Sequence, residues 1–91
     1  MTQLVVVVKN KLGLHARAAA KLVHLASRFS SDIFLSREGH QQAINCKSVL
    51  GVLMLAASEG TRLIVSVTGI DEAEASDAIG RLFAAGFGEE S

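Results

Sequence analysis

The sequence predicts an α+β domain of two layers, with three helices on one face of a four-stranded, largely antiparallel sheet in the order βαββαβα. A run of β-branched residues at 4–8 predicts the first strand. Apolar residues three and four apart predict helices at 16–28, within 45–55 and from 71 onward. Apolar and polar residues alternate at 62–68, which is typical of a strand with one buried face.

Length and composition indicate one globular domain, spanning 1–91, without a cofactor. Hydrophobic residues make up 49% of the chain and charged residues 20%, as in ordinary folded proteins. The four Phe residues are the only aromatics, so a base-stacking surface for nucleic acid is not expected.

The N-terminal residues and the cysteine content predict a cytoplasmic protein that does not bind membranes. The first residues contain neither a basic region nor a long apolar stretch, so neither a signal peptide nor a membrane span is expected. The single cysteine, Cys46, cannot form an internal disulfide, and we expect it to be a buried or half-buried small hydrophobic residue.

Charge is unevenly distributed although the net charge is zero. Every charged residue before Asp32 is basic, namely Lys9, Lys11, Arg17, Lys21 and Arg28. From residue 71 the acidic residues Asp71, Glu72, Glu74, Asp77, Glu89 and Glu90 accompany Arg81 alone. The basic N-terminal third favours an anion or an acidic partner, with simple solvated faces as the alternative interpretation.

Each predicted element has its own sequence pattern. We expect the strand at 4–8 to be central or buried on both sides. The helix at 16–28 should place Ala19, Leu22, Val23, Ala26 and Phe29 on the sheet, and segments 32–37 and 41–44 should form a hairpin. The last helix should begin with Asp71 and Glu74 as a capping box and end at Gly86 or Gly88.

Residues 13–20 are the segment in which chemistry is expected. His15 falls at or just before a helix start, where unpaired backbone N–H groups near Ala16 and Arg17 could hold a phosphoryl group. The Arg17 guanidinium adds a permanent positive charge. By itself this pattern is also compatible with a surface or helix-capping histidine.

Other chemistries are not expected. The three histidines and Cys46 lack the spacing of zinc ligands, so no metal site is predicted. No Ser/His/Asp set can be assembled. His24 is expected at the surface of its helix, and His40 in an exposed turn.

Two segments carry a resemblance to a known family. Gly13-Leu14-His15-Ala16-Arg17, directly after the first strand, resembles the active-site signature of the HPr phosphocarrier family. Lys47-Ser48-Val49-Leu50-Gly51-Val52 resembles that family's second signature, with a regulatory serine at the start of a short helix. The resemblance spans nearly the whole chain and implies the open-faced sandwich known for HPr.

The resemblance implies a carrier and not an enzyme. His15 would accept phosphate through Nδ1 from phosphorylated enzyme I of the phosphoenolpyruvate-dependent phosphotransferase system, with the Ala16 amide and Arg17 holding the phosphoryl group. An enzyme IIA domain, usually of a sugar permease, would receive it. The family's docking face would include Lys21, Leu50 and Leu53. Independently of the resemblance, we expect a monomer by default.

Ala18 departs from the family pattern, and Ser48 has two interpretations. The family usually has proline where this chain has Ala18, and alanine keeps the helix while adding a backbone donor. Ser48 is either an N-cap of its helix, a site for a regulatory serine kinase, or both.

Two alternative functions remain open. A carrier of the nitrogen regulatory branch would use the same histidine chemistry. A metabolite-sensing α+β domain would transfer no phosphate, but would leave the His15 and Ser48 signatures unexplained.

Overall fold

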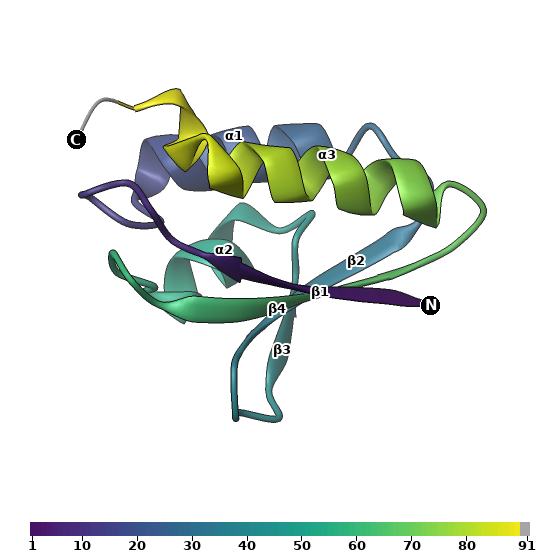
Figure 1. Ribbon diagram of the computed structural model, residues 1–91, viewed down its shortest axis with the longest axis horizontal. Coiled ribbons are helices and arrows are strands. Elements are labelled where there is room, and N and C mark those ends of the chain that lie inside the picture. Colours follow the sequence, from purple (N-terminus) through teal and green to yellow (C-terminus); the bar gives the residue numbers. More distant parts are fainter. Residues whose placement is uncertain (90–91) are drawn as a thin grey trace.

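The computed structural model describes residues 1–89 and confirms the predicted layers and element order. Figure 1 shows α1 and α3 crossing the same side of the sheet. The elements are β1 (Thr2–Val7), α1 (Ala16–Ala26), β2 (Asp32–Arg37), β3 (Ala43–Asn45), α2 (Val49–Leu55), β4 (Arg62–Thr68), α3 (Glu72–Ala84) and a final 3₁₀ turn, η1 (Gly86–Gly88). No helix in this part of the chain is both long and apolar enough to span a membrane.

The four strands are antiparallel and lie in the order β1-β4-β2-β3. β1 is therefore an edge strand, and the prediction that it is central or buried on both sides is wrong. Its side chains alternate, with Val6 buried and Val5 48% exposed. The reason is that the helices cover only one face of the sheet, so every second residue of the valine run faces solvent.

The core lies between that sheet face and the helices. β4 and β2 occupy the centre of the sheet and contribute buried residues such as Ile33 and Val65. The predicted stripe of α1 packs here through Ala19, Leu22 and Ala26, with Val23 and Phe29 partly buried. The helix ends at Ala26 rather than at Arg28, in a tightened final turn.

The segment between the hairpin and α2 is divided differently from the prediction. Residues 43–45 pair with β2, so the helix begins at Val49 and not near Asn45. Ser48 is its N-cap, because its hydroxyl accepts a hydrogen bond from the Gly51 N–H at 3.1 Å. A Cβ at Gly51 would lie 3.3 Å from the Ser48 Oγ, so close packing accounts for that glycine.

Asp71 precedes α3 as predicted, but the capping box with Glu74 is absent: the Asp71 side chain makes no capping hydrogen bond. Its carboxylate instead accepts hydrogen bonds from the backbone N–H groups of Ser30 and Ser31, both at 2.9 Å, and from both hydroxyls. These four donors outnumber the N–H groups that an N-cap side chain can reach in the first turn of α3. The Asp71 side chain therefore turns toward the loop between α1 and β2. The hydroxyl of Ser31, followed by the other donors, lowers the pKa of Asp71 from 3.8 to about 2.

We expect Asp71→Asn to lower the melting temperature by a few degrees at pH 7, because one amide oxygen cannot serve both serines. The folded pKa lies below the ordinary value, so the ionised carboxylate stabilises the protein above pH 3.8 and this effect is lost as the pH falls through about 2. The melting temperatures of the wild type and Asp71→Asn should therefore converge as the pH falls from about 7 to about 2. Asp77→Asn, at an exposed pair with Arg81, is the control. A gap that persists undiminished at the lowest pH would contradict this account.

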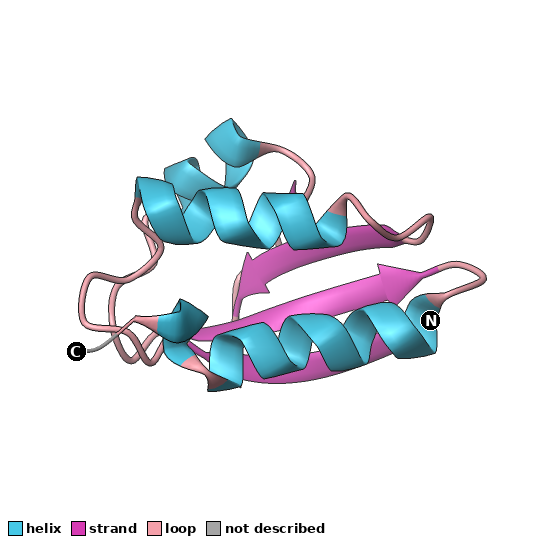
Figure 2. Ribbon diagram, turned by 90° about the horizontal axis from the view of Figure 1, so that it is seen from above, coloured by secondary structure: helices cyan, strands magenta, loops and turns pink. Residues whose placement is uncertain are grey.

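The C-terminal end of α3 follows the prediction. Ala85 is the C-cap, and Gly86 follows with a left-handed φ of +59°. The chain then turns through η1 and places Phe87 in the core, 1% exposed. This turn brings the C-terminal segment next to the loop between β1 and α1, at one end of the sandwich (Figure 2).

Candidate functional site at the start of α1

His15 is the N-cap of α1, as the sequence predicted. Its backbone is extended, with φ −73° and ψ 178°, and its carbonyl accepts from the Ala19 N–H at 2.8 Å. The preceding turn requires a glycine: Gly13 has φ +68°, and a Cβ there would lie 2.5 Å from the Ala57 carbonyl oxygen. Buried Asn10 stabilises the turn by donating from Nδ2 to the Gly13 carbonyl at 2.7 Å.

The imidazole of His15 is held through both ring nitrogens. The Arg17 N–H faces Nδ1 at 3.3 Å, and Nε2 lies 2.5 Å from Oε2 of Glu89. Both contacts are satisfied when the proton is on Nε2 and the lone pair is on Nδ1. The side chain is 25% exposed, so a reaction partner can still reach it.

The first turn of α1 offers donors next to this lone pair. Within residues 1–89, the N–H groups of Ala16 and Ala18 have no hydrogen-bond acceptor. Ala16 and Arg17 are exposed, whereas Ala18 is fully buried. No acidic residue occupies the first turn, so the helix itself adds no negative charge at its positive end. This end of α1 is suited to an anion.

A cationic cavity of about 310 Å³ lies on the same side of the molecule. Its lining residues are Lys11, Leu12, Arg17, Lys21, Gly88 and Glu89. Three of the N-terminal basic residues thus gather at one place. Lys21 donates to the Phe87 carbonyl at 2.7 Å, so this lysine also fixes the C-terminal segment.

Glu89 is the site residue that the sequence did not reveal as such. It is 74 residues from His15 and belongs to no local motif. Its Oε1 accepts from Asn10 Nδ2 at 3.0 Å while Oε2 contacts His15. The Asn10 hydrogen bond, and after it the His15 contact, lowers the pKa of Glu89. Glu90, the other C-terminal acid, lies outside the described residues.

The surface of α2 carries exposed apolar side chains. Leu50 is 68% exposed and Met54 74%, while Leu53 packs partly against the core. α2 lies against α1, so the exposed residue Lys21 and the apolar surface belong to neighbouring helices. Such a patch beside a polar site is typical of a surface that binds another protein.

The remaining candidates are placed as expected. His24 and His40 are exposed. Cys46 is fully buried, and burial raises the pKa of its thiol to about 12, which makes it inert as a nucleophile at neutral pH. Among residues 1–89 no group of three or more His, Cys, Asp or Glu side chains could hold a metal ion.

Comparisons with known proteins identify relatives of this chain. Residues 2–85 match the family described as the PTS HPr component phosphorylation site. The chain is 48% identical over 85 residues to phosphocarrier protein HPr of Xylella fastidiosa, covering 93% of each chain, and 41% identical over 85 residues to phosphocarrier protein NPr of Proteus mirabilis, again covering 93% of each.

A solved structure extends the likeness to the whole fold. The crystal structure of HPr-C-His from Thermoanaerobacter tengcongensis superposes with a TM-score of 0.93 at 41% identity, covering 100% of both chains. Family match, sequence identity and fold therefore coincide over the same residues. The chain belongs to the HPr family of phosphotransferase-system phosphocarrier proteins, which carry phosphoryl groups and are not enzymes.

Proposed function

We propose that His15 Nδ1 accepts a phosphoryl group from phosphorylated enzyme I and passes it to an enzyme IIA domain of a sugar phosphotransferase system. The observation that carries this proposal is the His15 ring, whose Nδ1 faces the α1 amides while Nε2 contacts Glu89. As the new N–P bond forms at Nδ1, the bond between phosphorus and the donor breaks. The proton on Nε2 stays directed at the carboxylate.

The phosphoryl oxygens would then replace Nδ1 as the acceptor of the Arg17 N–H. The Ala16 N–H and the Arg17 guanidinium supply further donors, and the helix end supplies a positive potential. Alanine at position 18 leaves a backbone N–H where the family usually has proline, but the residue is buried. We therefore assign the oxygens to Ala16 and Arg17.

Partner docking is assigned to Lys21, Leu50 and Leu53. Lys21 belongs to the basic N-terminal third, and Leu50 is exposed on α2, the helix that packs against α1. A basic residue on the helix next to an apolar patch suits a partner with an acidic rim. The proposal also includes action as a monomer in the cytoplasm, without a cofactor.

The direct experiment is phosphorylation in vitro. The protein is incubated with enzyme I, magnesium and phosphoenolpyruvate, and its intact mass is measured after alkaline and acidic treatment. One added phosphate that survives alkali and is lost in acid supports phosphohistidine. A folded protein that gains no phosphate from any enzyme I would overturn the proposal and favour a non-transferring domain.

The second candidate is a carrier of the nitrogen regulatory branch, which the 41% identity to an NPr supports, beside the 48% identity to an HPr. Both candidates use His15 in the same way, so the partners must distinguish them. Initial rates with sugar-type and nitrogen-type enzyme I, at equal concentrations, make the comparison. Faster phosphorylation by the nitrogen-type enzyme would reverse our choice.

Ser48 is proposed as a regulatory phosphorylation site as well as an N-cap. We expect Ser48→Asp to slow phosphorylation by enzyme I roughly tenfold, because a negative charge on the docking face repels an acidic partner. Aspartate also caps helices, so the melting temperature should stay close to wild type. Ser48→Ala should show the reverse: an unchanged rate and about 1 kcal/mol less stability. A wild-type rate for Ser48→Asp would contradict the repulsion.

We expect Glu89→Gln to slow phosphorylation of His15 roughly tenfold, because the carboxylate stabilises the Nε2–H form that leaves Nδ1 able to attack. The measurement is the initial rate with saturating phosphoenolpyruvate and limiting enzyme I. Glu74→Gln, an exposed residue of α3, is the matched control. A faster rate in Glu89→Gln would show instead that the carboxylate competes with the incoming phosphoryl group.

A further inference from the structure

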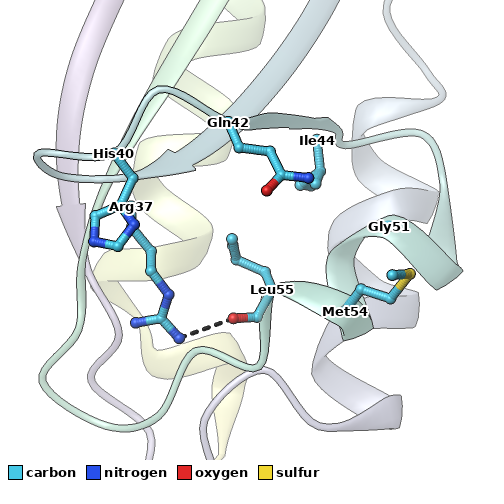
Figure 3. A pocket seen from close by; sticks show the side chains of 7 residues that line it. All are labelled: Arg37, His40, Gln42, Ile44, Gly51, Met54 and Leu55. Carbon is cyan, nitrogen blue, oxygen red and sulfur yellow. Dashed lines mark hydrogen bonds between the residues drawn. The ribbon is translucent and has the colours of Figure 1, made fainter.

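A second cavity lies away from His15, between the β2–β3 hairpin and α2 (Figure 3). Its volume is about 410 Å³, within the range of roughly 300–1,000 Å³ that is usual for small-molecule sites. It is lined by Arg37, His40, Gln42, Ile44, Gly51, Met54 and Leu55. None of these residues lines the cationic cavity beside His15, so the two cavities are separate.

One wall of this cavity carries a cation held in a fixed position. Nη2 of Arg37 donates to the carbonyls of Leu55 and Ala56, at 2.9 and 3.2 Å, which are unpaired acceptors at the end of α2. Within residues 1–89, its Nε and Nη1 groups have no hydrogen-bond acceptor. Figure 3 shows His40 and Arg37 on the same side of the cavity and the Gln42 amide directed into it.

Apolar side chains complete the lining. Ile44 and Leu55 are half-buried, and Met54 is 74% exposed at the rim. Gly51 contributes only backbone, and a Cβ there would contact the Ile44 Cβ at 3.6 Å. The missing side chain thus keeps the cavity open here, and the lining combines polar and apolar side chains.

We propose that this cavity binds a small organic anion. Its carboxylate or phosphate group would accept hydrogen bonds from Arg37, with His40 and Gln42 as further donors, because a guanidinium with unfilled N–H groups matches the oxygens of either anion. A compact apolar group of the same ligand would cover Ile44, Leu55 and Met54. This inference is independent of phosphotransfer through His15.

The experiment is an NMR titration of the ¹⁵N-labelled protein with phenylacetate, phenyl phosphate and the neutral phenylacetamide. We expect saturable shifts of the backbone amides in 37–44 and 51–55, with a dissociation constant of roughly 1 mM for the better anion. Phenylacetamide should bind at least tenfold more weakly. The tighter of the two anions identifies the head group as carboxylate or phosphate. Inorganic phosphate, which lacks the apolar part, should shift only amides near 15–21.

Variants locate the site. Arg37→Gln should weaken binding of the better anion at least tenfold. Because Arg37 also holds the end of α2, Gln42→Ala provides a second test that leaves this contact intact, and we expect it to weaken binding about threefold. Gln41→Ala, the exposed neighbour that does not line the cavity, is its matched control and should bind as wild type.

Three results would overturn the proposal. The first is anion-induced shifts confined to 15–21. The second is equal binding of phenylacetamide and the anions. The third is unchanged affinity in both Arg37→Gln and Gln42→Ala. Because the readout is binding, failure here leaves the phosphorylation of His15 untouched, and failure of phosphorylation leaves this result untouched.

Discussion

Replacing His15 by alanine is expected to abolish phosphorylation by enzyme I, with a loss on the order of a thousandfold or more in the initial rate. Within residues 1–89, His15 is the one histidine at which a ring nitrogen faces a helix N-terminus; His24 lies on the exposed side of α1 and His40 in the β2–β3 hairpin. His24→Ala is therefore the matched control and should accept phosphate at the wild-type rate. Intact mass and the initial rate are the measurements.

Alanine at position 15 also removes the N-cap of α1, which costs about 1 kcal/mol. A loss of activity could then be confused with partial unfolding. His15→Asn separates the two effects, because asparagine is a good N-cap but lacks the imidazole nucleophile. We expect it to melt close to wild type and to gain no phosphate. An acid-labile phosphate on either variant would place the acceptor elsewhere.

The part of the site that the sequence predicted is the part that is local. Gly13, His15 and Arg17 lie within one turn and one helix start, and their spacing alone fixes a histidine beside unpaired amides. Glu89 reaches the same histidine only because α3 and η1 return the chain to it. That return depends on packing across the whole domain, and no pattern of neighbouring residues records it.

The errors in the fold prediction have the same origin. The valine run at 4–8 correctly indicates a strand, but its place at the edge depends on which strand pairs with β4 on each side. Asp71 has the local pattern of a capping box, yet Ser30 and Ser31 bring four donors from a distant loop and take its carboxylate. In both cases partners far along the chain decided between locally acceptable alternatives.

Phe87→Ala is expected to cost about 3–5 kcal/mol of unfolding free energy, a large part of the roughly 5–15 kcal/mol typical of a domain. The ring is 1% exposed and packs edge-on against Phe83, with centroids 5.0 Å apart. Urea denaturation is the measurement. Phe34→Ala, on the open face of the sheet where the side chain is 40% exposed, is the control and should cost less than about 1 kcal/mol.

Phe87 links the stability of the domain to the geometry of the His15 site. Its carbonyl accepts from Lys21, and Glu89 follows two residues later, so loss of the ring should release the carboxylate from His15. Phe87→Ala should therefore also slow phosphorylation about as much as Glu89→Gln, roughly tenfold, when assayed at a temperature where both are folded. A wild-type rate in a folded Phe87→Ala would show that Lys21 and Asn10 alone hold the segment in place.

Backbone strain can be separated from ring burial at this position. Phe87 has a φ of +59°, in the left-handed region that costs a residue with a side chain roughly 1–2 kcal/mol. Alanine retains that strain, whereas glycine relieves it but also loosens the unfolded chain. We expect Phe87→Gly to be no less stable than Phe87→Ala despite the loss of one more carbon. If glycine proves clearly worse, the left-handed backbone is not strained, and burial of the Phe87 ring alone fixes the C-terminal segment against the site.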